Sequence, residues 1–318
     1  MPGYGTVSFQ NLPRYTMGAG ISTEFGTTIP PGARLAAYVR STGVQNTDDP
    51  DIKKRIMPTL NAALAECRSG YGDTVVVLPG HVENISGANQ MTNLVAGTRI
   101  IGLGAGTSRP TFTWTVAGST WLFNVANVEL VNCILNMDPG AGVTATVAAP
   151  ITVSAAGCSI VGCQMRMGSD ATALTTIGIT TTAAGDDLTI EDCEAYQGTA
   201  ASSTTMLRLV GADRFKMRNC KFTGATTAVA VGPVQMLTTA SLDVYSENCF
   251  CQNRVANSTG AFTGMTGATG ALVNCRASVL SGGAAAFATL GSLTLFGCTA
   301  SNALGGGNAV SPAAQTMS

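Results

Sequence analysis

Seven of the ten cysteines recur at nearly constant intervals, each inside the same short frame. These cysteines are Cys133, Cys163, Cys193, Cys220, Cys249, Cys275 and Cys298. The residue before each is Asn, Asp or Gly, which tolerate a left-handed backbone, and apolar residues precede nearly every one by three and five positions. The frame predicts a short strand that bends sharply at a small buried residue.

The repeat extends upstream, where Leu103 stands one interval before Cys133 in a similar frame. Most repeats also hold a second apolar segment before the frame, as in residues 121–123 and 151–153. Short strands that recur at this period, without helical heptads, favour a parallel β-helix, whose coils stack about 4.8 Å apart. Leucine-rich repeats and propeller blades fit this period and pattern less well. We therefore predict an all-β fold with a parallel β-helix over residues 71–302, and free thiols packed along one inside corner.

The composition excludes several classes of protein. The 318 residues include 17 Lys and Arg and 18 Asp and Glu, so only 11% are charged, against roughly a quarter in an ordinary domain. Phosphate recognition needs clustered cations, so a nucleic-acid binder is excluded.

The uncharged stretch Pro139–Met165 is rich in Gly, Thr and Ser, and predicts no membrane-spanning helix. The start of the chain does not resemble a signal peptide, so we expect folding in a reducing cytosol.

The two ends of the chain differ from the repeat. Residues 1–47 are predicted to form an extended arm. Residues 48–70 have helix-like apolar spacing, and predict a helix that covers the open top of the coils. Residues 303–318 are predicted to be a flexible or partner-bound tail. No charged residue follows Arg276, so we expect other subunits or a partner to cover this end.

The opening coils carry a family resemblance. The run Gly72–Gly80 after the expected helix, followed by the residues Ile101–Gly104, resembles pectate-lyase-like right-handed β-helix proteins. The resemblance covers about residues 49–301 and concerns the fold, not an activity. The chain is similar in particular to β-helical structural proteins of tailed-phage virions, which include polysaccharide-cleaving tailspikes and non-enzymatic head decoration proteins. The resemblance implies a right-handed, single-stranded β-helix and a trimer.

Three acidic residues are candidates for catalysis. Enzymes with this fold use paired carboxylates, or a Ca²⁺ site with a basic residue. Adjacent Asp186 and Asp187 resemble the Asp pair of polygalacturonase-like hydrolases, but the further Asp, His-Gly and Arg-Ile-Lys segments of that family do not follow. We favour a solvated turn for this pair. If the chain is an enzyme, Asp186, Asp187 and Glu191 are its candidate acids.

Opposite charges flank the third and fourth cysteines of the repeat. Stacked coils place Glu191 near Arg218 and Glu194 near Lys221, with Glu247 on the next coil. This spacing predicts a ladder of ion pairs on an outer sheet face, each contributing a few tenths to about 1 kcal/mol. A shallow sugar groove is the alternative.

The other conspicuous side chains indicate packing. His81 has no Ser or Cys partner at a recognisable spacing, so we expect a structural role for it. Trp114 and Trp121 are expected to lie in the core or to line a groove. No CxxC pair and no phosphate-binding glycine loop before a helix occur, so we predict no metal and no cofactor.

These observations favour a non-enzymatic virion structural protein of a bacteriophage, a homotrimer that decorates or cements the capsid. Its expected partners are itself and the major capsid protein or another virion protein, with no nucleic acid and no membrane. Its expected location is the virion, assembled in the host cytoplasm. The alternative is a tailspike or depolymerase that binds or cleaves bacterial surface polysaccharide. A secreted pectate lyase is disfavoured, because the export signal and the Ca²⁺ cluster are missing.

Overall fold

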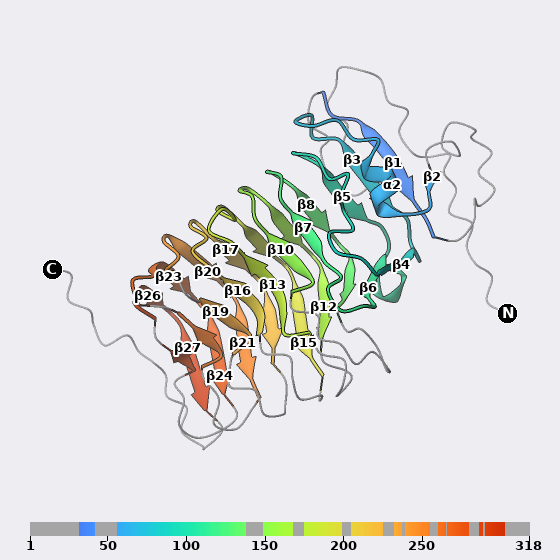
Figure 1. Ribbon diagram of the computed structural model, residues 1–318. Coiled ribbons are helices and arrows are strands. Elements are labelled where there is room, and N and C mark those ends of the chain that lie inside the picture. Colours follow the sequence, from blue (N-terminus) through green and yellow to red (C-terminus); the bar gives the residue numbers. More distant parts are fainter. Residues whose placement is uncertain are drawn as a thin grey trace.

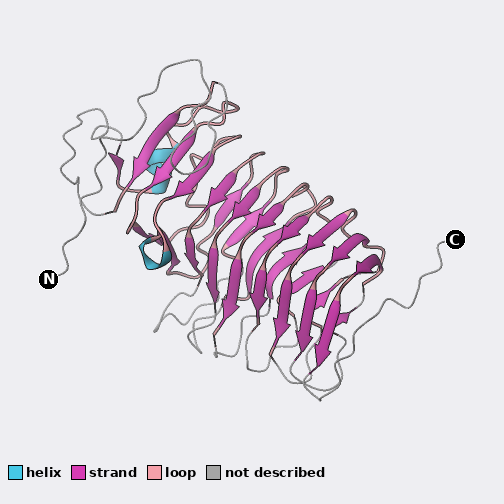
Figure 2. Cartoon of the chain, turned by 180° about the vertical axis from the view of Figure 1, so that it is seen from behind, coloured by secondary structure: helices cyan, strands magenta, loops and turns pink. Residues whose placement is uncertain are grey.

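The computed structural model is a rod of stacked β coils, with the N-terminal elements at one end and β24, β26 and β27 at the other (Figures 1 and 2). Three rows of parallel strands run along it, so each row is one face of the rod. The structure describes residues 32–41, 56–137, 149–167, 175–198, 205–224, 232–236, 239–254, 260–264, 266–279, 286–288 and 290–302.

The three rows are parallel sheets of eleven, nine and seven strands. From its N-terminal edge, the eleven-stranded sheet contains β2 (Ile56–Met57), β1 (Leu35–Val39), β3 (Thr74–Val77), β5 (Arg99–Gly102), β8 (Glu129–Val131), β11 (Ser159–Val161), β14 (Thr189–Glu191), β17 (Lys216–Arg218), β20 (Val244–Glu247), β23 (Thr269–Val273) and β26 (Ser292–Phe296). The nine-stranded sheet contains β4 (Val82–Ile85), β6 (Thr111–Trp114), β9 (Ile134–Asn136), β12 (Gln164–Met167), β15 (Glu194–Gln197), β18 (Lys221–Thr223), β21 (Phe250–Asn253), β24 (Arg276–Val279) and β27 (Thr299–Asn302). The seven-stranded sheet contains β7 (Trp121–Phe123), β10 (Ile151–Val153), β13 (Ile177–Thr181), β16 (Thr205–Leu209), β19 (Val234–Met236), β22 (Phe262–Thr263) and β25 (Phe287–Ala288).

From β7 onward, each coil visits the seven-, eleven- and nine-stranded sheets in that order, as β7, β8 and β9 do before β10 begins the next coil. Equivalent positions of successive sequence repeats pair with one another in neighbouring coils. Ile160, for example, pairs with Leu130 on one side and with Ile190 on the other. The predicted parallel β-helix is therefore confirmed.

Alternation along the strands separates the core from the surface. In β7, Trp121 and Phe123 point inward and are buried, whereas Leu122 between them is half-buried. Trp114 of β6 packs edge-on against Trp121, with ring centroids 5.0 Å apart. Both indoles therefore belong to the core, and neither lines an open groove.

A sharp bend joins the eleven-stranded sheet to the nine-stranded sheet in each coil. The predicted turn residue has a left-handed backbone in all seven cysteine frames. These residues are Asn132 (φ 56°), Gly162 (62°), Asp192 (52°), Asn219 (50°), Asn248 (53°), Asn274 (51°) and Gly297 (60°). Asn and Gly adopt this region most easily, which explains why the frame carries them.

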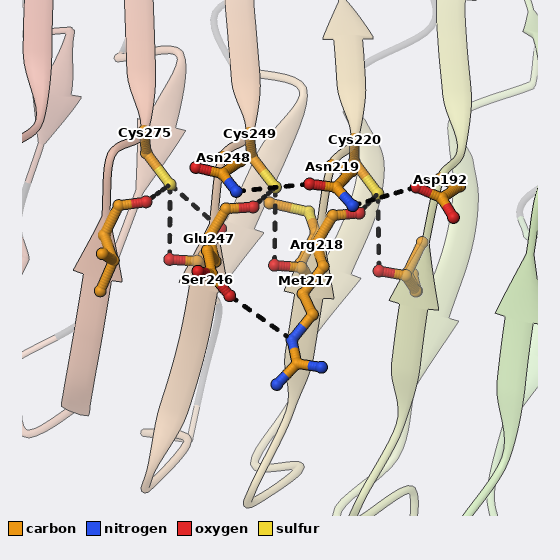
Figure 3. A network of polar contacts seen from close by, with 12 residues as sticks. Asp192, Met217, Arg218, Asn219, Cys220, Ser246, Glu247, Asn248, Cys249 and Cys275 are labelled. Atoms are coloured by element: carbon orange, nitrogen blue, oxygen red, sulfur yellow. Dashed lines mark hydrogen bonds and ion pairs between the residues drawn. The ribbon is translucent and has the colours of Figure 1, made fainter.

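The cysteine after each bend lies inside the corner, where its thiol bonds to backbone, as Figure 3 shows for Cys220, Cys249 and Cys275. Cys220 Sγ donates to the carbonyl of Arg218 at 3.1 Å, and it lies 3.5 Å from the carbonyl of Ile190 on the preceding coil. Outside the same corner, Asn219 Nδ2 donates to Asp192 Oδ1 at 3.1 Å. All ten cysteines are free thiols, and all but Cys67 are buried. The thiols inside the corner and the Asn side chains outside it therefore both join neighbouring coils.

The N-terminal end differs from the sequence prediction. A helix over residues 48–70 is not confirmed: β2 occupies Ile56–Met57, and α2 spans only Leu60–Leu64. Pro58 lies between them, and its missing N–H and fixed φ separate the strand from the helix. Thr59 caps α2, whose Leu60, Ala63 and Leu64 are buried. Residues 48–55 lie outside the described residues. In the part of the chain that is described, no helix is long and apolar enough to cross a membrane.

The eleven-stranded sheet also begins earlier than predicted. β1 falls inside the segment expected to be an extended arm, yet it pairs with β2 on one side and β3 on the other. Its residues Ala36–Val39 are buried, because this apolar run completes the sheet above the first coil. At the other end β27 finishes at Asn302, where the predicted domain ends. Residues 1–31, 42–47 and 303–318 lie outside the described residues.

Candidate functional site

Asp186 and Asp187 form the turn between β13 and β14, as the sequence predicts. Asp187 has a left-handed backbone with φ of 56°, which Asp tolerates better than most residues. Asp186 Oδ1 accepts a hydrogen bond from the backbone N–H of Asp213, one coil further on, at 2.8 Å. The pair is therefore fixed to the next turn of the stack.

Arg214 of that next coil holds both carboxylates. Its Nε and Nη2 donate to the two carboxylate oxygens of Asp187 at 2.8 and 2.9 Å, and Nη2 also lies 3.3 Å from Asp186 Oδ2. These hydrogen bonds, with the positive charge of Arg214, lower the pKa of Asp187. The same contact raises the pKa of Arg214. Asp187 is thus ionised at neutral pH.

Glu191 lies at the end of β14, on the outer face of the eleven-stranded sheet and away from the Asp186–Asp187 turn. It pairs in register with Val161 on one side and Arg218 on the other. Arg218 in turn approaches Glu247, with Nε and Oε2 3.7 Å apart. The structure thus brings Asp186 and Asp187 together, and places Glu191 in the predicted charge ladder.

On the nine-stranded sheet, Glu194 and Lys221 form the second predicted pair. They are in register, and Lys221 Nζ donates to Glu194 Oε1 at 3.2 Å. Both side chains are about half exposed, with 47% and 59% of their surface accessible. Exposed pairs of this kind stabilise a protein only slightly.

This arrangement limits what the acids can do chemically. A general acid near neutral pH needs a carboxyl whose pKa is raised by burial or by a neighbouring anion. Asp187 has the opposite environment, because a bidentate guanidinium stabilises its charged form. To act as a nucleophile, Asp187 would first have to leave Arg214. The contact between Asp187 and Arg214 therefore connects two neighbouring coils.

Arg214 was missed by the sequence reasoning, although a usable signal exists. It follows Asp187 at an offset of 27 positions, the same offset that relates Glu194 to Lys221 on the neighbouring sheet. Applying the repeat spacing to the turns as well as to the strands would have found it.

A second missed cluster surrounds Asp73, at the start of β3. The Asp73 side chain is fully buried and accepts hydrogen bonds from the backbone N–H groups of Arg34 and Arg68, at 3.0 and 2.9 Å. The Arg68 guanidinium adds two bonds, at 2.9 and 2.7 Å. Burial alone raises the pKa of Asp73, but the bonds from Arg68 and Arg34 outweigh it, and the pKa is lowered. This carboxylate joins the strand β1 region to the first coil.

His81 also serves the N-terminal end. It is fully buried, and its Nε2 lies 3.1 Å from Glu83 Oε2. The same carboxylate oxygen accepts the backbone N–H of Leu60, the first residue of α2, at 2.8 Å. His81 and Glu83 therefore connect the first coil to α2. Within the described residues, no group of three His, Cys, Asp or Glu side chains is placed to hold a metal ion.

Comparisons with known proteins give a fold likeness. No protein-family model matches the chain, and no curated protein matches it. Among solved structures, a rhamnogalacturonan lyase is similar, at 12% identity and a TM-score of 0.44, over 77% of this chain and 74% of the lyase chain. The chain is a three-sided parallel β-helix, and a fold by itself does not imply a function.

Proposed function

We propose that this chain is a non-enzymatic structural protein of a phage virion, a homotrimer that decorates or cements the capsid. The observation that carries the proposal is the uneven charge of the three outer faces. On the eleven-stranded sheet, outward positions carry Arg99, Glu129, Glu191, Lys216, Arg218 and Glu247.

The seven-stranded sheet is different. Its outward positions form one row, with a single charged member in seven strands. The uncharged row, as it is called below, consists of Leu122, Thr152, Thr180, Gln235, Thr263 and Ala288, and Arg208 is the one charged residue that interrupts it. Parallel sheets are normally covered on both faces, and the centres of protein interfaces are depleted of charge. The uncharged row is therefore the face best suited to meet other copies of the chain.

The uncharged row can form the contact between subunits in a trimer whose threefold axis runs parallel to the rod. Each copy then turns the same face toward the shared axis, so the contact closes and no filament grows. Seven strands about 4.8 Å apart provide a contact about 30 Å long. The two charged faces remain outside, for solvent and for the capsid.

Two of the three candidate acids support the structural half of the proposal. Asp186 and Asp187 both bond Arg214, so these carboxylates already have a cation from the next coil, as Glu194 has in Lys221. Repeated joints of this kind stabilise a rod that must persist on a particle surface.

The proposal is tested on virus particles and on glycans. Gradient-purified particles of the virus that encodes the chain should contain its peptides by mass spectrometry, in a fixed ratio to the capsid protein. The purified chain should release no reducing ends or unsaturated products from bacterial capsule or lipopolysaccharide. Glycan cleavage that is lost in Asp187→Asn or Glu191→Gln, but kept in Glu194→Gln, would establish the depolymerase instead.

A further inference from the structure

Two guanidinium groups converge on one neutral oxygen on the outer face of the nine-stranded sheet. Gln164 Oε1 accepts Arg166 Nη2 at 2.8 Å and lies 3.4 Å from Arg109 Nη2. The two Nη2 atoms are therefore within about 6 Å of each other. Arg109 reaches this point from the turn after β5, and its Nη1 also donates to the Gly162 carbonyl at 3.1 Å.

This cationic pair has no counter-ion in the part of the chain that is described. Six other described cations have a carboxylate partner: Arg34, Arg68, Arg99, Arg214, Arg218 and Lys221. The acid nearest in register is Glu194, next to Gln164 on the following coil, and it bonds Lys221 on its far side. Two like charges this close repel each other at a protein surface. Within the described residues, no carboxylate therefore forms an ion pair with Arg109 or Arg166.

One N–H donor of this cationic pair also makes no hydrogen bond. Arg166 Nε is buried and has no hydrogen-bond partner. Arg166 stands between Asn136 and Tyr196 in register, so polar side chains border the pair on both sides. A guanidinium offers a planar fork of N–H donors that matches the oxygens of carboxylate, phosphate or sulfate.

We propose that Arg109, Gln164 and Arg166 form a binding site for an oxyanion, either a free phosphate-type ion or the carboxylate of an acidic protein segment. An anion that lies beside Gln164 Oε1 accepts a hydrogen bond from the remaining N–H groups of each guanidinium and offsets their mutual repulsion. The Gln164 amide, which has its own N–H donors, completes the site. The site does not depend on the proposed virion function, because it follows from the charges of this face alone.

The structure supplies a matched control. Arg254 also reaches across two coils, donating to the Gly224 carbonyl at 2.8 Å and to the Gln197 carbonyl at 3.0 Å. It shares the backbone contacts of Arg109 without a convergent second guanidinium. Arg254→Gln therefore removes the same kind of joint and leaves the proposed site intact.

The test measures inorganic phosphate binding to the full chain by calorimetry and thermal shift, with chloride at equal ionic strength as the reference. Wild type and Arg254→Gln should bind phosphate with a Kd on the order of 1 mM. Arg166→Gln should weaken binding at least about tenfold, which corresponds to about 1.4 kcal/mol. Gln164→Glu places a carboxylate in the site, so it should raise the melting temperature without phosphate and abolish the response to phosphate.

A short oligoglutamate peptide distinguishes the two sources of the anion. Peptide binding tighter than phosphate and lost in Arg166→Gln would assign the site to an acidic protein segment, whereas phosphate binding alone would assign it to a small ion. The proposal is wrong if wild type binds neither probe, or if correctly folded Arg166→Gln and Gln164→Glu bind as wild type does.

Discussion

The outer face of the eleven-stranded sheet and the uncharged row of the seven-stranded sheet belong to the same coils, yet they carry different chemistry. In one coil, β13 presents Thr180 outward and β14 presents Glu191. In the next coil, Arg208 follows Thr180 and Arg218 follows Glu191. The register and the core are shared, so neither explains the difference in charge. We propose that the difference reflects what each face meets: water on one side, protein on the other.

Within the charged regions, burial decides how much each ion pair contributes. Asp73 is fully buried and accepts bonds from two arginines, whereas the Glu194 and Lys221 side chains are about half exposed. Removing a carboxylate from a buried cluster leaves donors unpaired, whereas water replaces an exposed partner.

The largest expected effect is that of Asp73→Ala. It leaves two backbone N–H groups and the Arg68 guanidinium without their acceptor, and should lower the free energy of unfolding by about 2–4 kcal/mol. Urea denaturation measures the change. Glu194→Ala, which removes an exposed carboxylate, is the control and should stay close to wild type. Equal losses in the two variants would contradict the role assigned to burial.

The uncharged row is tested by Thr180→Lys. The new cation lies beside Arg208 in register, so a trimer would bury two neighbouring like charges where wild type buries one. We expect the dissociation constant of the trimer to rise at least about a hundredfold, measured by sedimentation at decreasing protein concentration. The control is Thr189→Lys in the same coil, which lies beside Lys216 on the charged face. It should leave the trimer intact, and dissociation of both variants alike would refute the assignment of the face.

Acid should weaken the N-terminal end through Asp73. Its pKa is lowered in the folded chain, so its stabilising effect is complete above the unfolded value of about 3.9 and is lost as the pH falls through the folded value. Urea midpoints of wild type should therefore drop below about pH 4 more steeply than those of Asp73→Asn. Parallel curves for the two proteins would show that Asp73 does not contribute.

The smallest expected effect is that of Asp187→Asn. Asp187 and Arg214 are both well exposed, so the melting temperature should fall by no more than about 3 °C, despite the bidentate geometry. Differential scanning calorimetry checks this. A fall above about 8 °C would show that the turn contributes as a buried joint does.

The sequence predicted the repeated parts of this molecule well and the irregular parts poorly. The cysteine frame gave the corner, its left-handed residues and the register of Glu194 with Lys221, because every coil obeys the same constraint. The N-terminal end has no such constraint. There the apolar spacing of residues 48–70 matched a helix, although Ile56–Met57 form a strand that pairs with β1. Arg214 and the Asp73 cluster escaped prediction, because the cysteine frame fixes the strands, whereas these contacts lie in a turn and at the irregular N-terminal end.

The mass of the full chain in solution tests the central claim most directly. A chain of 32.2 kDa that assembles through its uncharged row should sediment as a trimer of about 97 kDa at micromolar concentration. Its mass should fall to that of the single chain in Thr180→Lys and not in Thr189→Lys. A wild-type chain that sediments at 32.2 kDa at every concentration would contradict the account.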